Sequence, residues 1–321
     1  MVRVSITPPP PTGPPLAPTP APTPACPVVI GALHLDLVGR LADAHRPAAS
    51  NPVRFEASPG GVGANVARAI AAAGLPCRLI TPCGGDSASD PVLVLPGVTI
   101  DRVAIGGCEP GRYVAILDQR GELVAGYSDT RACEMASAGQ LLAVLARQAA
   151  TLCVLDANLS AEAIAGTVAG SRAPIAAVAV SPVKAQRLAP VATGIALLFC
   201  NRREALALTR VPDGASLETL ADGLHAAGFA RVVLTDGPAG LLVAEPEGRH
   251  RLAAPSVGAG GVAGVNGAGD ALAGATLARL ALSGTAPGTP FDAAAPSGRP
   301  SLCDAVATAG TQAARQVLLA R

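Results

Sequence analysis

The chain is poor in aromatic and charged residues, and these shortages exclude several classes of protein. Aromatic residues make up 2% of its 321 residues, tryptophan is absent, and the formal net charge is +1. Proteins that bind RNA by stacking need aromatic platforms, and those that bind nucleic acid by charge need a basic surplus. We therefore expect no nucleic-acid partner. Lys184 is the only lysine, and we attribute this preference for arginine to coding bias.

Cysteine spacing and hydrophobic runs exclude two further classes. No two of the eight cysteines are spaced C-x-x-C, and no histidine lies at zinc-finger distance, so we expect reduced thiols and no metal cluster. No uncharged stretch approaches the roughly 20 strongly apolar residues that span a bilayer. The N-terminus also lacks the pattern of a secretory signal. We therefore expect a cytoplasmic protein without a membrane partner.

The order of the segments predicts an α/β fold. Residues 1–27 are rich in proline, which removes hydrogen-bond donors and favours extended geometry, so we expect a disordered tail before a globular domain over 28–321. From about residue 140, helix and strand patterns alternate, which predicts βαβ units and a mainly parallel sheet. Strands are expected at 28–31, 78–81, 152–156, 176–180, 196–200 and 231–235, and helices at 65–73, 140–149, 161–169 and 217–227. The half-exposed strands around 33–58 and 108–128 predict a small antiparallel appendage, which we interpret as a lid.

The segment Gly264–Gly274 carries the most information about chemistry. Its glycines form a turn that opens a helix, and Asp270 falls in the first turn of that helix. Backbone N–H groups at a helix N-terminus lack partners and attract anions. A carboxylate beside such a pocket could accept a proton from an alcohol, and the pair suits phosphoryl transfer to a hydroxyl. A simple helix cap would give a similar pattern.

Three other segments are weaker signals when taken singly. Gly60, Gly61 and Gly63 precede a predicted helix that begins near Asn65, so a ligand could approach the backbone closely. Asn201 and Glu204 follow a strand three residues apart, where they could orient Mg²⁺ or form a capping box. The turn from Thr235 to Gly237 ends a further strand and could lie under a nucleotide.

Taken together and in this order, the four segments resemble the PfkB (ribokinase-like) family of carbohydrate kinases. The stretch Gly60–Gly84 is similar to the first signature of that family, and Gly267–Asp270 to the second. The resemblance implies a three-layer α/β/α fold with a small β lid. Within the family, four stretches are most similar to pseudouridine kinases, which phosphorylate the ribose 5′-hydroxyl using ATP: Asn51–Gly63, Tyr113–Leu123, Asp156–Ser160 and Ser181–Val183.

The resemblance also implies a role for each motif residue. Asp270 would be the catalytic base, and the N–H groups of Gly267, Ala268 and Gly269 would hold the migrating phosphoryl group. Ribose hydroxyls would be bound by Asp36, Gly60, Gly61 and Asn65. ATP would be bound by Asn201, Glu204, Thr235 and Gly237, with Glu204 contacting Mg²⁺ through water. The resemblance further implies a homodimer formed through the lid, because an edge strand would otherwise remain unpaired.

Several positions depart from the family pattern. Gly264 stands where the family usually has Asp or Asn, and Asn266 where it usually has Thr, which reduces the support for a monovalent cation such as K⁺. Ser181 replaces a common Asp, and Ser128–Thr130 differs from the Asn-Asp-Met of close relatives. Two alternatives therefore stay open. One is another kinase of the family, acting on a different nucleoside or on a free sugar such as ribose or fructose. The other is a catalytically quiet homologue that binds nucleosides.

Overall fold

The computed structural model describes residues 26–85, 91–256, 267–284 and 300–319. The expected N-terminal tail and the positions Gly264 and Asn266 therefore lie outside the described residues, apart from the end of the tail at Cys26 and Pro27. Among the described residues, no helix is long and apolar enough to cross a membrane. All eight cysteines are described, and each is a free thiol.

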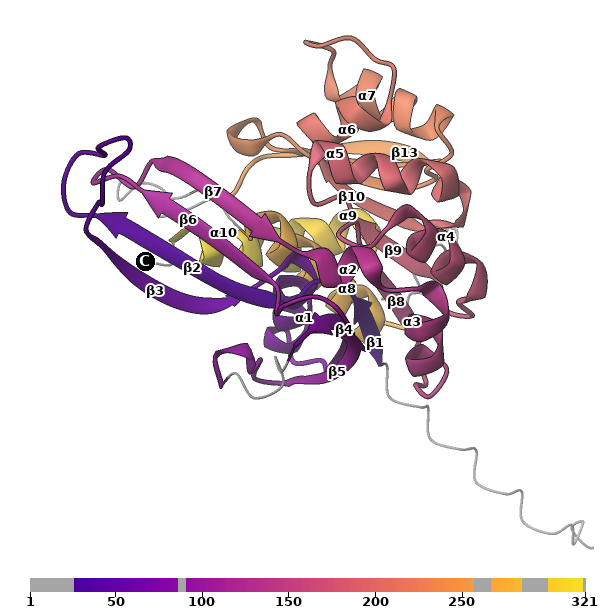
Figure 1. Cartoon of the computed structure of the whole chain (residues 1–321). Helices are drawn as coiled ribbons and strands as arrows, with labels where there is room; N and C mark the ends of the chain where they lie inside the picture. Colours follow the sequence, from indigo (N-terminus) through magenta and orange to yellow (C-terminus); the bar gives the residue numbers. More distant parts are fainter. Residues whose placement is uncertain (1–25, 86–90, 257–266, 285–299, 320–321) are drawn as a thin grey trace, which may run out of the picture.

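A nine-stranded sheet forms the centre of the molecule (Figure 1). Its strands, in spatial order, are β13 (Gly248–Leu252), β12 (Leu241–Glu245), β11 (Val232–Thr235), β10 (Leu197–Asn201), β9 (Ile175–Val178), β8 (Leu152–Asp156), β1 (Pro27–Ile30), β4 (Cys77–Gly84) and β5 (Val98–Ile105). All neighbours pair in parallel except β11–β12 and β12–β13. The predicted mainly parallel sheet is confirmed, and the antiparallel hairpin at its edge is an addition to the prediction.

Helices cover both faces of this sheet because its strands are apolar on both sides. In β1, Val28 and Ile30 pack into one core cluster, whereas Val29 between them packs into the other. One face is covered by α1 (Val62–Ala72), α8 (Ala268–Leu282), α9 (Leu302–Ala305) and α10 (Thr311–Leu319). The other is covered by α2 (Arg131–Met135), α3 (Ala138–Leu145), α4 (Ala161–Gly170), α5 (Pro182–Ala185), α6 (Arg202–Leu208) and α7 (Leu217–Ala226). This is the predicted three-layer α/β/α architecture.

The elements differ from the predictions mainly at their ends. The helix expected over 140–149 is α3 over Ala138–Leu145, which begins earlier because Ser137 and Gln140 form a capping box. Strand β5 and helices α2, α5, α9 and α10 were not predicted. Helices α2, α5 and α9 have five residues or fewer, too few to show an apolar period.

The predicted appendage is a separate four-stranded sheet with the order β3-β2-β6-β7. Its strands are β3 (Val53–Gly60), β2 (His34–Leu41), β6 (Arg112–Leu117) and β7 (Leu123–Asp129). The outer pairs are antiparallel, as expected, whereas the central pair β2–β6 is parallel. Figure 1 shows this sheet projecting from the body of the molecule. Strand β3 leads directly into α1, so the appendage reaches the carboxyl edge of the large sheet.

Candidate active site

A cavity of about 630 Å³ lies at the carboxyl ends of the central strands. Parallel sheets commonly bind ligands at this edge. The small sheet contributes His34, Asp36 and Tyr113 to the lining. Residues that follow the large-sheet strands contribute Asn158, Ser181, Asn201 and Thr235, and the start of α8 contributes Gly267, Gly269 and Asp270. The cavity thus joins the two sheets and the glycine turn that the sequence singled out separately.

Most of the predicted site residues meet in this cavity. Asp36, Gly61, Asn65, Asn201, Glu204, Thr235, Gly267, Gly269 and Asp270 all line it. Three predicted site residues are absent from the lining: Gly60, Ala268 and Gly237. Gly60 lies behind Asp36, whose carboxylate fills the space that a Cβ on Gly60 would need. Gly237 lies in an exposed turn beyond the end of β11.

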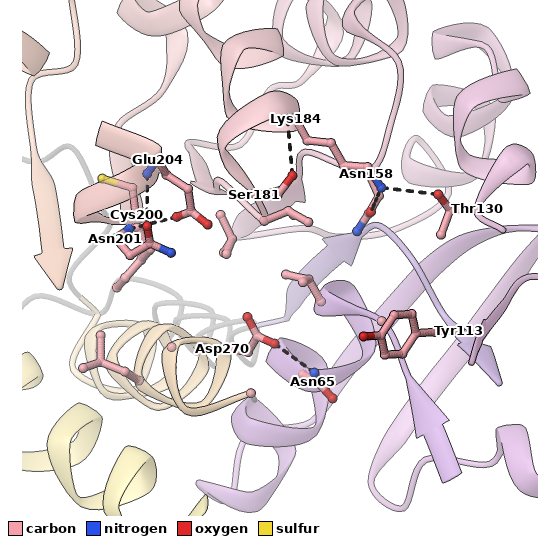
Figure 2. A pocket seen from close by; sticks show the side chains of 18 of the residues that line it. Asn65, Tyr113, Thr130, Asn158, Ser181, Lys184, Cys200, Asn201, Glu204 and Asp270 are labelled. Carbon is pink, nitrogen blue, oxygen red and sulfur yellow. Dashed lines mark hydrogen bonds between the residues drawn. The ribbon is translucent and has the colours of Figure 1, made fainter. Parts of the chain in front are cut away.

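Asp270 faces Asn65 across the junction of α8 and α1. The Nδ2 of Asn65 donates to Oδ2 of Asp270 at 2.8 Å, and the Oδ1 of Asn65 accepts from the guanidinium of Arg68. In the structure, Asn65 therefore orients the carboxylate, a contact that the sequence did not predict. Figure 2 shows this pair on one wall of the cavity.

The approach of α1 to α8 depends on Gly274. A Cβ at Gly274 would come within 2.5 Å of the Ala69 side chain and 2.6 Å of the Val66 carbonyl oxygen. Because glycine has no Cβ, the two helices can cross closely enough for their first turns to meet. The glycine at this position in α8 therefore helps to place Asp270 beside Asn65.

Partial burial raises the pKa of Asp270 from 3.8 to about 6, because the carboxylate loses water. The hydrogen bond from Asn65 lowers the same pKa, and the charge of Asp156 raises it. A carboxylate with a pKa near 6 is ionised at neutral pH and is a stronger base than an ordinary aspartate. Among the described residues, this is the best-placed general base in the cavity.

The first turn of α8 lies beside this base and has the geometry of an anion site. Gly267 is the N-cap residue, adopts a left-handed φ of 80°, and has no side chain that could accept from the helix. Asp270 is directed to Asn65 instead of capping its own helix. Among the described residues, no side chain caps the N–H groups at the start of this 15-residue helix, so they could bind an anion, which the helix dipole would also attract.

Asn201 and Glu204 form a complete capping box at the start of α6. The Oδ1 of Asn201 accepts from the Glu204 N–H at 3.0 Å, and the Oε2 of Glu204 accepts from the Asn201 N–H at 2.8 Å. The capping box, which the sequence allowed as an alternative to a metal site, is therefore formed. Burial raises the pKa of Glu204. Because the box engages only Oε2, the carboxylate still presents oxygen to the cavity, and oxygen is the ligand that Mg²⁺ prefers.

Asp156 links the elements that surround the cavity. It is 1% exposed, and its Oδ2 accepts from the N–H groups of Ala32 and Gly63, each at 2.8 Å. Its Oδ1 accepts from the Asn158 N–H at 3.0 Å. One carboxylate at the end of β8 thus fixes the turn after β1 and the start of α1. The sequence placed Asp156 at a strand end but did not reveal this role.

Lys184 is a cavity residue that the sequence did not indicate. Its Nζ donates to Asn158 Oδ1 at 2.6 Å and to Thr130 Oγ1 at 3.3 Å. The preference for arginine over lysine, which we attributed to coding bias, gave no indication that Lys184 would lie in this cavity. No spacing motif marks it, because Thr130, Asn158 and Lys184 come from three separate segments.

Comparison with known proteins agrees with this geometry. The family model described as pfkB family carbohydrate kinase matches residues 27–300, so the chain belongs to the pfkB family of carbohydrate kinases. It is a phosphotransferase with a hydroxyl acceptor, and its class is that of sugar and nucleoside kinases.

The chain is also similar to individual proteins of known name. The chain is 29% identical over 260 residues to the pseudouridine kinase of Escherichia coli. The matched region covers 76% of this chain and 80% of that protein. A carbohydrate kinase from Agrobacterium tumefaciens is 28% identical, with a TM-score of 0.72 over 90% of this chain and 89% of that structure. A ribokinase from Cryptococcus neoformans in complex with ADP shares the fold, with 20% identity and a TM-score of 0.67 over 92% and 95% of the two chains.

Proposed function

We propose that the protein transfers the γ-phosphoryl group of ATP to the ribose 5′-hydroxyl of pseudouridine, giving pseudouridine 5′-phosphate and ADP. The observation that carries this proposal is the placement of Asp270, with its raised pKa, beside the open N-terminus of α8. The similarity to the pseudouridine kinase of E. coli supports the choice of substrate.

In this reaction the 5′-oxygen forms a bond to the γ-phosphorus as the bond from that phosphorus to the β–γ bridging oxygen breaks, and ADP leaves. The carboxylate of Asp270 takes the proton of the 5′-hydroxyl. The N–H groups at Gly267, Ala268 and Gly269 stabilise the charge on the transferred group. Asp36, Gly61 and Asn65 would hold the ribose, with Gly60 shaping the position of Asp36.

ATP would lie toward Asn201, Glu204, Thr235 and Gly237. The buried carboxylate of Glu204 fits a role in holding Mg²⁺ through water. When bound, Mg²⁺ neutralises phosphate charge and so assists the transfer. The small sheet would act as a lid that excludes water from the cavity.

We further propose that the protein is a cytoplasmic homodimer formed through the small sheet. Several large apolar side chains are exposed on that sheet: Phe55, Leu123, Val124 and Tyr127 are 48%, 59%, 38% and 66% exposed, respectively. A second copy would cover them and would pair the open edge strands.

The test is ATP-dependent phosphorylation of pseudouridine, measured beside uridine and ribose by ADP release and by the mass of the product. We expect the highest kcat/KM for pseudouridine. Higher turnover of ribose would instead favour a sugar kinase of the ribokinase type, the second candidate, which is consistent with membership of a family of carbohydrate kinases. The absence of any phosphorylated product would indicate a catalytically quiet nucleoside-binding homologue.

A further inference from the structure

Lys184 lies in the cavity together with Thr130 and Asn158, apart from the capping box of Asn201 and Glu204 (Figure 2). Its half-buried side chain donates to Asn158 Oδ1 and Thr130 Oγ1. A lysine ammonium has three donors, and these two contacts use two of them. The third donor can meet a ligand in the cavity.

The structure around Lys184 holds this group in place. The backbone of Asn158 donates to Asp156, and Arg187 donates to the carbonyl oxygens of Asn158 and Leu159 at 3.1 and 2.9 Å. Just before α5, Val180 adopts a φ of 70°, and the Ser181 N–H closes a γ-turn onto the Ala179 carbonyl at 2.8 Å. A left-handed valine is rare, and such strain tends to occur at functional sites.

The charges around the cavity indicate what Lys184 can bind. Among the described lining residues, Lys184 is the only side chain with a permanent positive charge, whereas Asp36, Glu204 and Asp270 are acidic. The arginines nearest in sequence to this group, Arg131 and Arg187, are paired with Asp129 and Glu134. A phosphate-bearing sugar would therefore bring a further charged group beside the phosphates of ATP, into a cavity lined by three carboxylates and one ammonium. An uncharged group with a carbonyl oxygen would be accepted at lower cost, because it brings no charge to be repelled.

We propose that Lys184, with Thr130 and Asn158, forms the subsite that accepts a carbonyl oxygen of the uncharged base of the nucleoside. This inference rests on the proposed nucleoside kinase function and deepens it. A free sugar carries no base that could accept from Lys184, so we expect Lys184 to favour a nucleoside over ribose.

The first experiment compares wild-type protein with Lys184→Met for pseudouridine and for ribose. A hydrogen bond to a charged donor is usually worth about a 10- to 100-fold change in binding. We expect kcat/KM for pseudouridine to fall by about that factor, mainly through KM, and the loss with ribose to be at least about tenfold smaller. Val183→Ala is the matched control, because Val183 is the neighbouring residue of α5 and is 79% exposed.

The second experiment uses the fact that Lys184 is the only lysine in the chain. An amine-reactive acylating reagent can label only Lys184 and the N-terminal amine, and peptide mass spectrometry separates the two sites. We expect saturating pseudouridine to protect Lys184 but not the N-terminal amine, and ribose to protect neither. This measurement uses the unaltered protein and does not depend on how a variant folds.

The possible outcomes separate the inference from the proposed function. If the wild type phosphorylates pseudouridine and Lys184→Met does so equally well, the proposed function stands and the inference is wrong. Equal losses for pseudouridine and ribose, or labelling of Lys184 that pseudouridine does not reduce, would also overturn the inference. A wild type that phosphorylates only free sugars contradicts both.

Discussion

The substitution Asp270→Asn is expected to abolish most activity and at the same time to stabilise the fold. Asparagine keeps the shape of the side chain and its contact with Asn65, but it cannot take a proton from an alcohol. A general base contributes on the order of 10²–10⁴ in rate, so we expect kcat to fall by that factor. Activity of the wild type should rise with pH and level off above about pH 6, where Asp270 becomes ionised.

The gain in stability follows from the same pKa. The carboxyl group titrates near 3.8 in the unfolded chain and near 6 in the folded protein, so its ionised form costs up to about 3 kcal/mol of folding free energy. Because Asp270 is only half-buried and cavity water screens its charge, we expect a gain of about 1–3 kcal/mol from removing that charge. The corresponding increase in Tm is a few degrees for a chain of this size.

The size of the gain in stability depends on pH, whereas its sign does not. A folded pKa above the unfolded value gives a contribution to stability that is fully present below pH 3.8 and is lost as the pH rises through about 6. The Tm difference between Asp270→Asn and wild type should therefore be small near pH 4 and complete above pH 7. Thermal unfolding followed by circular dichroism across this range measures it.

Asp304→Asn is the matched control, because Asp304 also lies in the first turn of a helix. Its carboxylate accepts from the Ser301 N–H at 3.0 Å, and its pKa is lowered, not raised. The substitution should lower stability at neutral pH and leave phosphoryl transfer intact. The reasoning is refuted if Asp270→Asn keeps activity within tenfold of wild type, or if its Tm does not exceed that of wild type at pH 7.

Three further results are expected. Replacing Asn65 by alanine removes a hydrogen bond that lowers the pKa of Asp270, so the rising limb of the pH–rate profile should move to higher pH, and a limb that stays in place would contradict this. Asp156→Asn should destabilise the protein by about 2–4 kcal/mol in urea unfolding, because three backbone N–H groups would face one oxygen and an NH₂ group. Substituting Leu123 and Tyr127 together by aspartate should convert a dimer to a monomer in sedimentation experiments, and wild-type protein that sediments only as a monomer would disprove the dimer.

The sequence predicted the large sheet and the start of α8 well, since their signals are local. Alternating helix and strand patterns indicate βαβ units, and Gly267 and Asp270 are three residues apart in the chain. Asn201 and Thr235 were likewise expected at the ends of strands, and parallel strands bring their carboxyl ends to one edge. The structure places all of these residues in one cavity.

Contacts between distant segments could not be predicted in the same way. Asn65 and Asp270 are 205 residues apart, and their hydrogen bond depends on how closely α1 crosses α8. The parallel pairing of β2 with β6 is also invisible, because an alternating pattern shows that a strand has one buried face but not which strand lies beside it. A short motif can also fit two roles. The pair Asn201 and Glu204 was compatible with a helix cap and with a metal contact, and the structure shows the cap.

The charges that line the cavity relate the role of Asp270 to that of Lys184. Asp270 is a stronger base because water is partly excluded from it, and that exclusion makes costly any further negative charge that the N-terminus of α8 or Mg²⁺ does not neutralise. A substrate that carried its own phosphate would add such a charge beside three carboxylates, whereas a neutral nucleoside would not. The single ammonium of Lys184 can then bind a carbonyl oxygen without neutralising the base, because it is held by Asn158 and Thr130 rather than by Asp270. The same partial burial that tunes the base therefore favours an uncharged substrate.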